Sequence, residues 1–117
     1  MFKKENRLGS SIRFLNPVVY NTAYFTLKIA KNDTKNNRFG FIVTKKVDKR
    51  AVVRNKVKRK VRLCFEGLKL DIKPGYDMLC FIKAPATDST FELLRDTIIK
   101  LLKKEKLLNE AINNSNY

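Results

Sequence analysis

Alternating hydrophobic and polar positions predict two strands in the first half of the chain. Residues 23–30 (AYFTLKIA) alternate well enough for a strand, and the Asn- and Asp-rich run after them has the composition of a turn. In residues 38–45 (RFGFIVTK), Phe39, Phe41 and Val43 fall on one face of a second strand. We expect the two runs to pair as a β-hairpin.

Helical spacing replaces the alternation after a short basic loop. The pattern predicts a helix from about Arg50 to Leu68, with its hydrophobic residues about 3.6 positions apart on one face. These residues occupy positions 53, 57, 61, 64 and 68. The helix is therefore amphipathic, with one stripe for a core and the rest of its surface for solvent or a partner.

The second half of the chain predicts one more strand and one more helix. A Pro-Gly pair at 74–75 marks a turn, and the nearly continuous apolar run that follows it is typical of a central strand covered on both faces. Ser89 and Glu92 have the spacing of a capping box. They predict a helix with Phe91, Leu94, Ile98 and Leu101 on one face. Before residue 23, Gly9 and Pro17 leave room for at most a short helix.

The composition bounds the class of protein. A length of 117 residues fits one domain, and we see no repeat. No apolar run approaches 18 residues, so no membrane span is expected. Cys64 and Cys80 sit in apolar contexts and are expected to be small core residues in a reducing compartment, which indicates the cytoplasm. We expect residues 1–8 and 109–117 to fray.

The net charge is the unusual quantity. The chain has 26 Lys and Arg residues against 11 Asp and Glu, a net charge of +15. Residues 38–65 alone carry 11 basic side chains and one carboxylate, Asp48. Solubility is normally served by mixed signs, so this segment favours a polyanionic partner over a merely solvated helix face. Arg and Lys are phosphate-binding residue types, and Asn55 among them can both donate and accept hydrogen bonds.

Catalytic residue types are scarce. The sequence has no histidine, which removes the usual general base at neutral pH and most zinc sites. The carboxylates are scattered, and no two are spaced to meet on a helix face. If the protein takes part in catalysis, we expect the chemistry to belong to a partner.

Three ordered segments resemble the signature of the bacterial ribonuclease P protein subunit. That family has R-x-G-x-x-V-S-K-K followed by A-V-x-R-N-R-x-K-R in a basic helix. This chain has RFGF at 38–41, VTKK at 43–46 and AVVRNKVKR at 51–59. Asn6-Arg7-Leu8 also resembles the family's N-terminal segment, and the order of elements agrees through about residue 108.

The resemblance implies an α/β fold, an α+β sandwich forming a single RNA-binding domain over 1–117. The implied element order is αβββαβα, with a left-handed β-α-β crossover that is an exception to the usual handedness. The first helix is expected to be short here, because the segment between Leu8 and Tyr24 is short and contains Pro17.

The resemblance also implies a function in tRNA processing. The family's protein is a subunit of an endoribonuclease, a ribonucleoprotein hydrolase that removes the 5′ leader of precursor tRNA. Its RNA subunit carries out the hydrolysis with Mg²⁺. The expected partners are thus the catalytic RNA and precursor tRNA, with no membrane and no small-molecule substrate. We expect no catalytic side chain, and no metal bound by the protein alone.

The family's contacts transfer onto particular positions of this sequence. The RNA-binding candidates are Arg38, the pair Lys45 and Lys46, and the helix residues Arg54, Asn55, Lys56, Lys58, Arg59 and Arg62. The leader lies in a cleft between the sheet and the first helix, and Phe14 and Phe25 are the candidates for base stacking there. The alternative for both rings is plain core packing. Lys56 replaces an Arg of the family pattern, and Thr44 replaces its Ser.

Three other classes are weighed beside this one. A ribosomal or general basic RNA-binding protein would bind mature and precursor tRNA alike. A DNA-binding regulator would place the basic helix in the major groove, but no helix-turn-helix pairing precedes that helix. A nuclease that cuts alone with magnesium is the least compatible with the side chains present.

Overall fold

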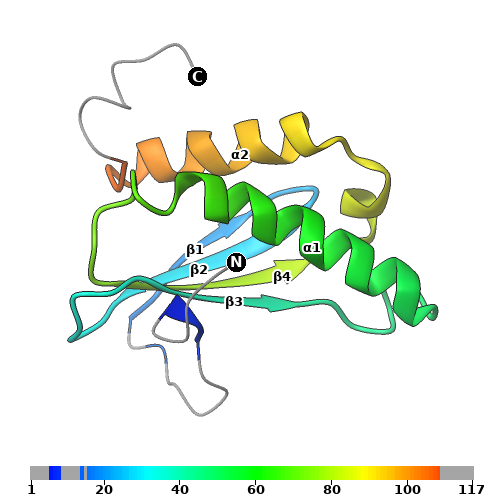
Figure 1. Ribbon diagram of the computed structural model, residues 1–117, viewed down its shortest axis with the longest axis horizontal. Helices are drawn as coiled ribbons and strands as arrows, with labels where there is room; N and C mark the ends of the chain where they lie inside the picture. Colours follow the sequence, from blue (N-terminus) through cyan, green and yellow to red (C-terminus); the bar gives the residue numbers. More distant parts are fainter. Residues whose placement is uncertain (1–5, 9–13, 15, 109–117) are drawn as a thin grey trace.

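The computed structural model describes residues 6–8, 14 and 16–108. One four-stranded sheet carries two α-helices and a 3₁₀ helix, η2, on one of its faces (Figure 1). The elements are β1 Val18–Asn21, β2 Phe25–Lys31, β3 Arg38–Ile42, α1 Ala51–Leu68, β4 Tyr76–Ile82, η2 Ala84–Asp88 and α2 Phe91–Lys104. The mixed α+β architecture in one domain confirms the fold class predicted from the sequence. The first helix of the predicted order lies mostly outside the described residues.

The strand order is β1-β2-β4-β3, which overturns the predicted hairpin. β2 pairs antiparallel with β1 and β4, whereas the strand that β3 pairs with is β4, in parallel. β4 therefore enters between the two strands that the alternation pattern had joined. The long turn at 32–37 leads away from β2 to the sheet edge instead of closing a hairpin. Because β3 and β4 are parallel neighbours, α1 forms the crossover between them, and its left-handed sense stays a prediction.

The observed hairpin is β1 with β2, joined by residues 22–24. The Thr22 backbone N–H donates to the Phe25 carbonyl at 2.9 Å, and the Thr22 hydroxyl accepts from the Phe25 N–H at 3.1 Å. These bonds close the loop that brings β1 back beside β2. The hydrophobic pattern missed β1, because four residues following Pro17 are too few to display a period, whereas the element order implied by the family resemblance has three strands before the basic helix and includes it.

α1 confirms the predicted boundaries and phase. Val57, Val61, Cys64 and Leu68 are buried, and Val53 at the start of the stripe is half-buried. Phe65, adjacent to this stripe, is fully buried, and its ring packs on β3. Its centroid lies 5.6 Å from that of Phe39 and 5.5 Å from that of Phe41. α1 thus covers the β3 side of the sheet.

α2 covers the other side, with a cap and a phase that differ from the prediction. Thr90 caps the helix, and its hydroxyl accepts from the Leu93 N–H at 3.1 Å, while the Ser89 hydroxyl donates to the Pro85 carbonyl. The buried residues are Leu94, Ile98, Ile99 and Leu102. Leu94 and Ile98 confirm the predicted face, whereas Phe91 is 37% exposed at its margin.

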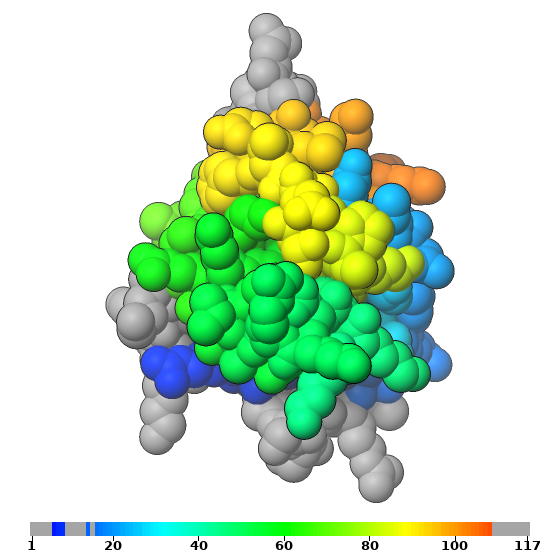
Figure 2. All heavy atoms as spheres, turned by 90° about the vertical axis from the view of Figure 1, so that its right-hand side faces the viewer, coloured from blue at the N-terminus to red at the C-terminus, as the bar shows by residue number. Residues whose placement is uncertain are grey.

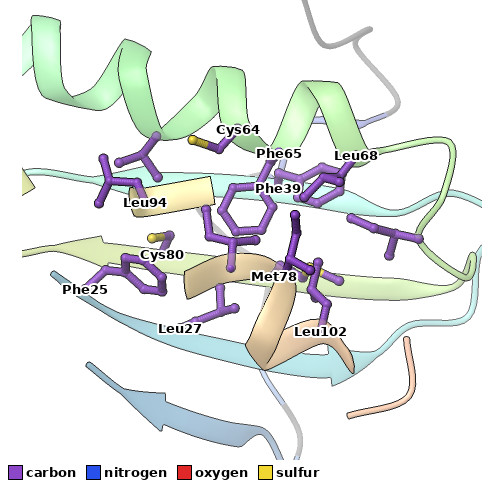
Figure 3. Close-up of a cluster of buried hydrophobic side chains, with 14 of the residues drawn as sticks. Phe25, Leu27, Phe39, Cys64, Phe65, Leu68, Met78, Cys80, Leu94 and Leu102 are labelled. Carbon is purple, nitrogen blue, oxygen red and sulfur yellow. The ribbon is translucent and has the colours of Figure 1, made fainter. Parts of the chain in front are cut away.

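The core lies between the sheet and the two helices (Figure 3). Alternate residues of β2 and β4, among them Leu27 and Met78, point into it. Cys64 and Cys80 are free and buried there, which confirms their expected packing role. Burial raises the pKa of the Cys64 thiol to about 11, so the thiol stays protonated at neutral pH.

The N-terminal residues 6–8 are tied to the edge of the sheet. Arg7 forms a parallel bridge with Phe39, and the Leu8 N–H donates to the Phe39 carbonyl at 2.9 Å. A Cβ on Gly40 would lie 3.0 Å from Leu79 Cδ1 and 3.2 Å from Leu8 Cδ2, so a larger residue there would require these side chains to shift by a few tenths of an ångström. The backbone contacts join Arg7 and Leu8 to β3, and the fraying expected for the two ends of the chain stays a prediction.

The packing of α1 makes its phase testable by a charge substitution. Val57→Asp places a carboxylate at a site that is 2% exposed and belongs to the hydrophobic core. We expect a loss of several kcal/mol, about 3–5, from the free energy of unfolding. Chemical denaturation followed by circular dichroism measures it. Val52→Asp is the matched control, because Val52 is 79% exposed on the same helix. Equal stability of the two variants would mean that the helix phase is wrong.

Candidate RNA interface

The charges on the outer surface of α1 are almost all positive. Its 18 residues contain six basic side chains and one acid, Glu66, and none of the six is buried. Asn55, Lys56 and Arg59 are exposed, and the other four basic residues are half-buried: Arg54, Lys58, Lys60 and Arg62. The sequence-predicted residues of this helix therefore share one accessible surface. Their contact with RNA stays a prediction.

Two hollows flank α1. The β3-side groove, of 420 Å³, lies between the helix and the sheet edge, and its lining includes the cationic side chains of Arg7, Lys58 and Arg62. The η2-side groove, of 330 Å³, lies at the start of the helix. Its lining includes Arg50, Lys56, Lys60 and the carboxylates of Asp48 and Asp88. Basic side chains thus continue from the helix into the hollows on both sides. Figure 2 shows the end of the molecule at which α1 begins, with the first turns of α1 below η2 and the start of α2.

Lys60 holds α1 against η2. Its Nζ donates to the Ser89 carbonyl at 2.6 Å and to the Thr87 carbonyl at 3.2 Å. The ammonium therefore satisfies the last-turn carbonyl of Thr87 in η2 and the carbonyl of Ser89 just after it, a bridge that the sequence pattern does not reveal. Lys60 was not among the predicted RNA contacts, and its bonds give it a place inside the fold.

The turn between β3 and α1 presents Lys45 and Lys46. The Val47 N–H donates to the Thr44 carbonyl at 3.0 Å, which closes a β-turn around the two lysines. Both side chains are exposed at the entrance to α1. The structure therefore brings the predicted lysine pair next to the predicted helix residues.

Arg54 bonds to the segment that precedes its own helix. Its Nη1 donates to the Lys49 carbonyl at 2.8 Å and to the Asp48 carbonyl at 3.0 Å. Part of its donor capacity is therefore used within the chain, and only its remaining N–H groups can meet a phosphate.

Asp48 organises the same segment from its side chain. Its Oδ1 accepts from the Arg50 N–H at 2.8 Å and from Arg50 Nε at 3.0 Å, and its Oδ2 accepts from Arg50 Nη2 at 2.9 Å. These bonds from Arg50 lower the pKa of the Asp48 carboxyl to about 2. A lowered folded-state pKa means that the interaction is present above pH 4 and is lost as the pH falls through 2.

Arg38 lies apart from the helix residues. It points to the sheet face away from the helices, where its Nε and Nη2 donate to the two Asp77 oxygens at 2.7 and 2.8 Å. Asp77 is 3% exposed and also accepts from Asn32 Nδ2 at 2.8 Å. The guanidinium thus neutralises a buried carboxylate. The sequence prediction grouped Arg38 with the RNA contacts, and the structure gives it a role inside the fold.

The structure corrects the predicted role of Phe25 in the leader cleft. Its side chain is 0% exposed and points into the core between the sheet and the helices, so no base can stack on it (Figure 3). Core packing, the alternative weighed for it, is the observed role. Phe14 is half-buried, and most residues around it in the sequence lie outside the described part.

The sheet face away from the helices offers a different ring. Phe81 is half-buried on this face, and Lys28 Nζ lies 5.2 Å from its ring centroid. Thr26 pairs with Phe81 across β2 and β4 and donates its hydroxyl to Asn21 at 2.9 Å. The sequence analysis read the β4 run as covered on both faces and so missed this ring, because Cys80, Phe81 and Ile82 are all apolar and the run shows no alternation.

Two further searches cover the described residues only. Within them, no group of three or more His, Cys, Asp or Glu side chains is placed to hold a metal ion. No helix of residues 51–104 is long and apolar enough to cross a bilayer.

Comparison with known proteins places the chain in a family. The family model described as ribonuclease P matches residues 2–106. A ribonuclease P protein component from Clostridium botulinum (strain 657 / Type Ba4) is 33% identical over 111 residues, which cover 91% of this chain and 99% of that protein. The chain belongs to the ribonuclease P protein family.

Solved structures of ribonuclease P proteins have the same fold. The protein from Staphylococcus aureus is 29% identical with a TM-score of 0.68, over 80% of this chain and 84% of that one. The protein from Thermotoga maritima is 28% identical with a TM-score of 0.67, over 76% and 84%. The family recognised from the sequence is confirmed. The chain is therefore the protein component of an endoribonuclease ribonucleoprotein that acts in tRNA processing.

The Arg38–Asp77 pair gives a stability prediction. Arg38→Ala leaves the Asp77 carboxylate buried with Asn32 as its remaining side-chain donor. We expect a loss of about 2–3 kcal/mol from the free energy of unfolding, measured by chemical denaturation. Arg38→Ala combined with Asp77→Asn should recover part of the loss, because no charge is then stranded. Arg59→Ala, an exposed control, should change stability by less than about 0.5 kcal/mol. An Arg38→Ala protein as stable as this control would remove the structural role of the pair.

Proposed function

We propose that α1 and the turn before it hold the catalytic RNA of ribonuclease P by its phosphates. The observation that carries the proposal is that α1 buries an apolar stripe and carries six basic side chains and one acid on the rest of its surface. Arginine forks and lysine ammonium groups bind phosphate oxygens through charge-assisted hydrogen bonds. The grooves on both sides of the helix extend this cationic surface toward Arg7 and Arg50. Membership in the ribonuclease P family supplies the RNA that such a surface would meet.

We propose that the 5′ leader of precursor tRNA lies on the sheet face away from the helices. Unpaired bases stack on aromatic rings, and a neighbouring cation attracts the backbone between them. Phe81 and Lys28 supply these two groups side by side. Phe81 thus takes the place that the sequence analysis gave to Phe25, while Phe14 stays a candidate for the opposite wall.

Hydrolysis belongs, in this proposal, to the RNA partner with Mg²⁺. Among the described residues, no group of three or more His, Cys, Asp or Glu side chains is placed to hold a metal ion, so the proposal assigns no magnesium ligand to them. The described side chains therefore contribute binding and orientation. The protein is expected to act in the cytoplasm, in keeping with its two free, buried thiols.

The test is cleavage of a precursor tRNA by ribonuclease P RNA at limiting magnesium, with and without the protein. We expect faster cutting at the mature 5′ end when the protein is present, and none by the protein alone. The RNA should come from the same genome, so that a mismatched partner cannot explain a negative result. Tight RNA binding without any stimulation would instead favour a general RNA-binding protein, and cutting by the protein alone would favour a self-sufficient nuclease.

The cationic surface predicts the effect of a single substitution on RNA binding. Arg59→Ala removes an exposed cation from α1 and should weaken binding to the catalytic RNA by about 1–3 kcal/mol. The log–log dependence of affinity on salt should also become shallower by about 0.7–0.9. Filter binding across a salt series measures both quantities. Lys100→Ala is the control, because it removes an exposed cation from α2 and should leave the slope unchanged.

The proposed leader path predicts a selective defect. Phe81→Ala should weaken binding of precursor tRNA to the holoenzyme by about 1–2 kcal/mol, the range for a lost base–ring stack. Mature tRNA lacks the leader, so its affinity should not change and serves as the internal control. Affinity measurements with both tRNAs test this. Equal losses for the two would place the leader elsewhere.

A further inference from the structure

The turn into α1 concentrates positive charge. Between Thr44 and Arg54 the chain carries five cations: Lys45, Lys46, Lys49, Arg50 and Arg54. Asp48 is the one carboxylate in this segment, and the first turn of α1 contains no acid and no side-chain cap. Left to their mutual repulsion, these cations would spread apart. Asp48 is therefore the local group that can hold the segment together electrostatically.

The contacts of Asp48 fit such a role. Its carboxylate accepts three bonds from Arg50, one of them from the backbone N–H, at 2.8–3.0 Å. Its backbone carbonyl accepts from Arg54 Nη1 at 3.0 Å. One residue thus joins the side chain of Arg50 and the second turn of α1 to the loop, directly after the β-turn that carries Lys45 and Lys46.

Two opposite consequences for RNA binding are conceivable. In the first, Asp48 masks Arg50 and repels phosphate, so its removal would tighten binding. In the second, Asp48 fixes the directions in which the cations point, so its removal would cost affinity, because the loop must then be ordered during binding. The geometry favours the second. The Arg50 side chain is 75% exposed while paired, whereas that of Asp48 is 20% exposed, so the carboxylate lies inward and leaves the cation accessible.

We propose that Asp48 is a positioning residue for RNA binding, which holds segment 44–54 in the shape in which its cations meet the phosphates of the catalytic RNA. The inference rests on the proposed function of α1. In this inference Asp48, the one acid of a basic segment, orients Arg50 and Arg54 and does not itself touch the RNA.

The test removes the charge of Asp48, and the direction in which the affinity for RNA then changes separates the two consequences. Asp48→Asn and Asp33→Asn each remove one negative charge, and Asp33 lies exposed in the turn between β2 and β3. If net charge decides, both variants bind the catalytic RNA more tightly, and to a similar extent. We expect Asp48→Asn to bind about three- to tenfold more weakly and Asp33→Asn to bind as well as the original chain or better. Equal or tighter binding by Asp48→Asn would overturn the proposal.

A second measurement separates positioning from a loss of folding. Asp48→Asn should keep a free energy of unfolding large enough for the domain to be folded at the assay temperature. Its log–log salt slope should fall by about 0.7–0.9, because one phosphate contact is no longer aligned. In an Arg50→Ala variant, which lacks the side chain that Asp48 holds, the further effect of Asp48→Asn should shrink to less than about twofold. A full, additive effect in that background, or an unchanged slope, would show that Asp48 does not act through Arg50.

The same experiment keeps this inference apart from the proposed function. If the original chain binds its RNA with a nearly flat salt dependence, phosphate contact by α1 fails and the role of Asp48 fails with it. If the original chain binds with a steep salt dependence but Asp48→Asn binds no more weakly, only the positioning role fails.

Discussion

The structure depends on how α1 packs on the sheet. The ring of Phe65, set against Phe39 and Phe41, together with the buried valines of the same stripe, fixes the rotation of this helix about its axis. Because side chains on a helix are related by a fixed angle, fixing one face also fixes where every basic residue points. A core contact thus determines the direction of the cationic surface. A helix that buries one face and keeps its cations on the rest of its surface needs this regular hydrophobic spacing.

A net charge of +15 opposes this compact arrangement, and part of the charge is used within the fold. Lys60 bonds to two carbonyls beside η2, Arg54 to two carbonyls before α1, and Arg38 to the buried carboxylate of Asp77. In each case a cation serves a carbonyl or carboxylate of the chain that would otherwise need another donor. The basic residues therefore divide into those that hold the fold and those that remain available on its surface. Composition cannot separate the two groups.

The sequence predicted the parts of the fold that depend on local periodicity. The boundaries of α1, its buried stripe and the packing of both cysteines follow from spacing alone. The pairing of strands does not, because β4 inserts between β2 and β3 from a distant part of the sequence, and alternation says nothing about neighbours. The same limit explains Phe25. Alternation places a residue on one of two faces, but only the position of the helices decides which of those faces is closed.

β4 shows the same limit, because both of its faces carry apolar side chains. Met78, Cys80 and Ile82 complete the core under the helices, while Phe81 meets Lys28 on the opposite face. A strand that must supply apolar residues to both faces reads as a continuous hydrophobic run, whether the second face is closed by protein or left for a ligand. What distinguishes the cases here is the cation over the ring, since a side chain buried by protein on all sides leaves no room for a solvated ammonium. On this ground the face away from the helices is the one on which the leader is proposed to lie, and α1 is left for the catalytic RNA.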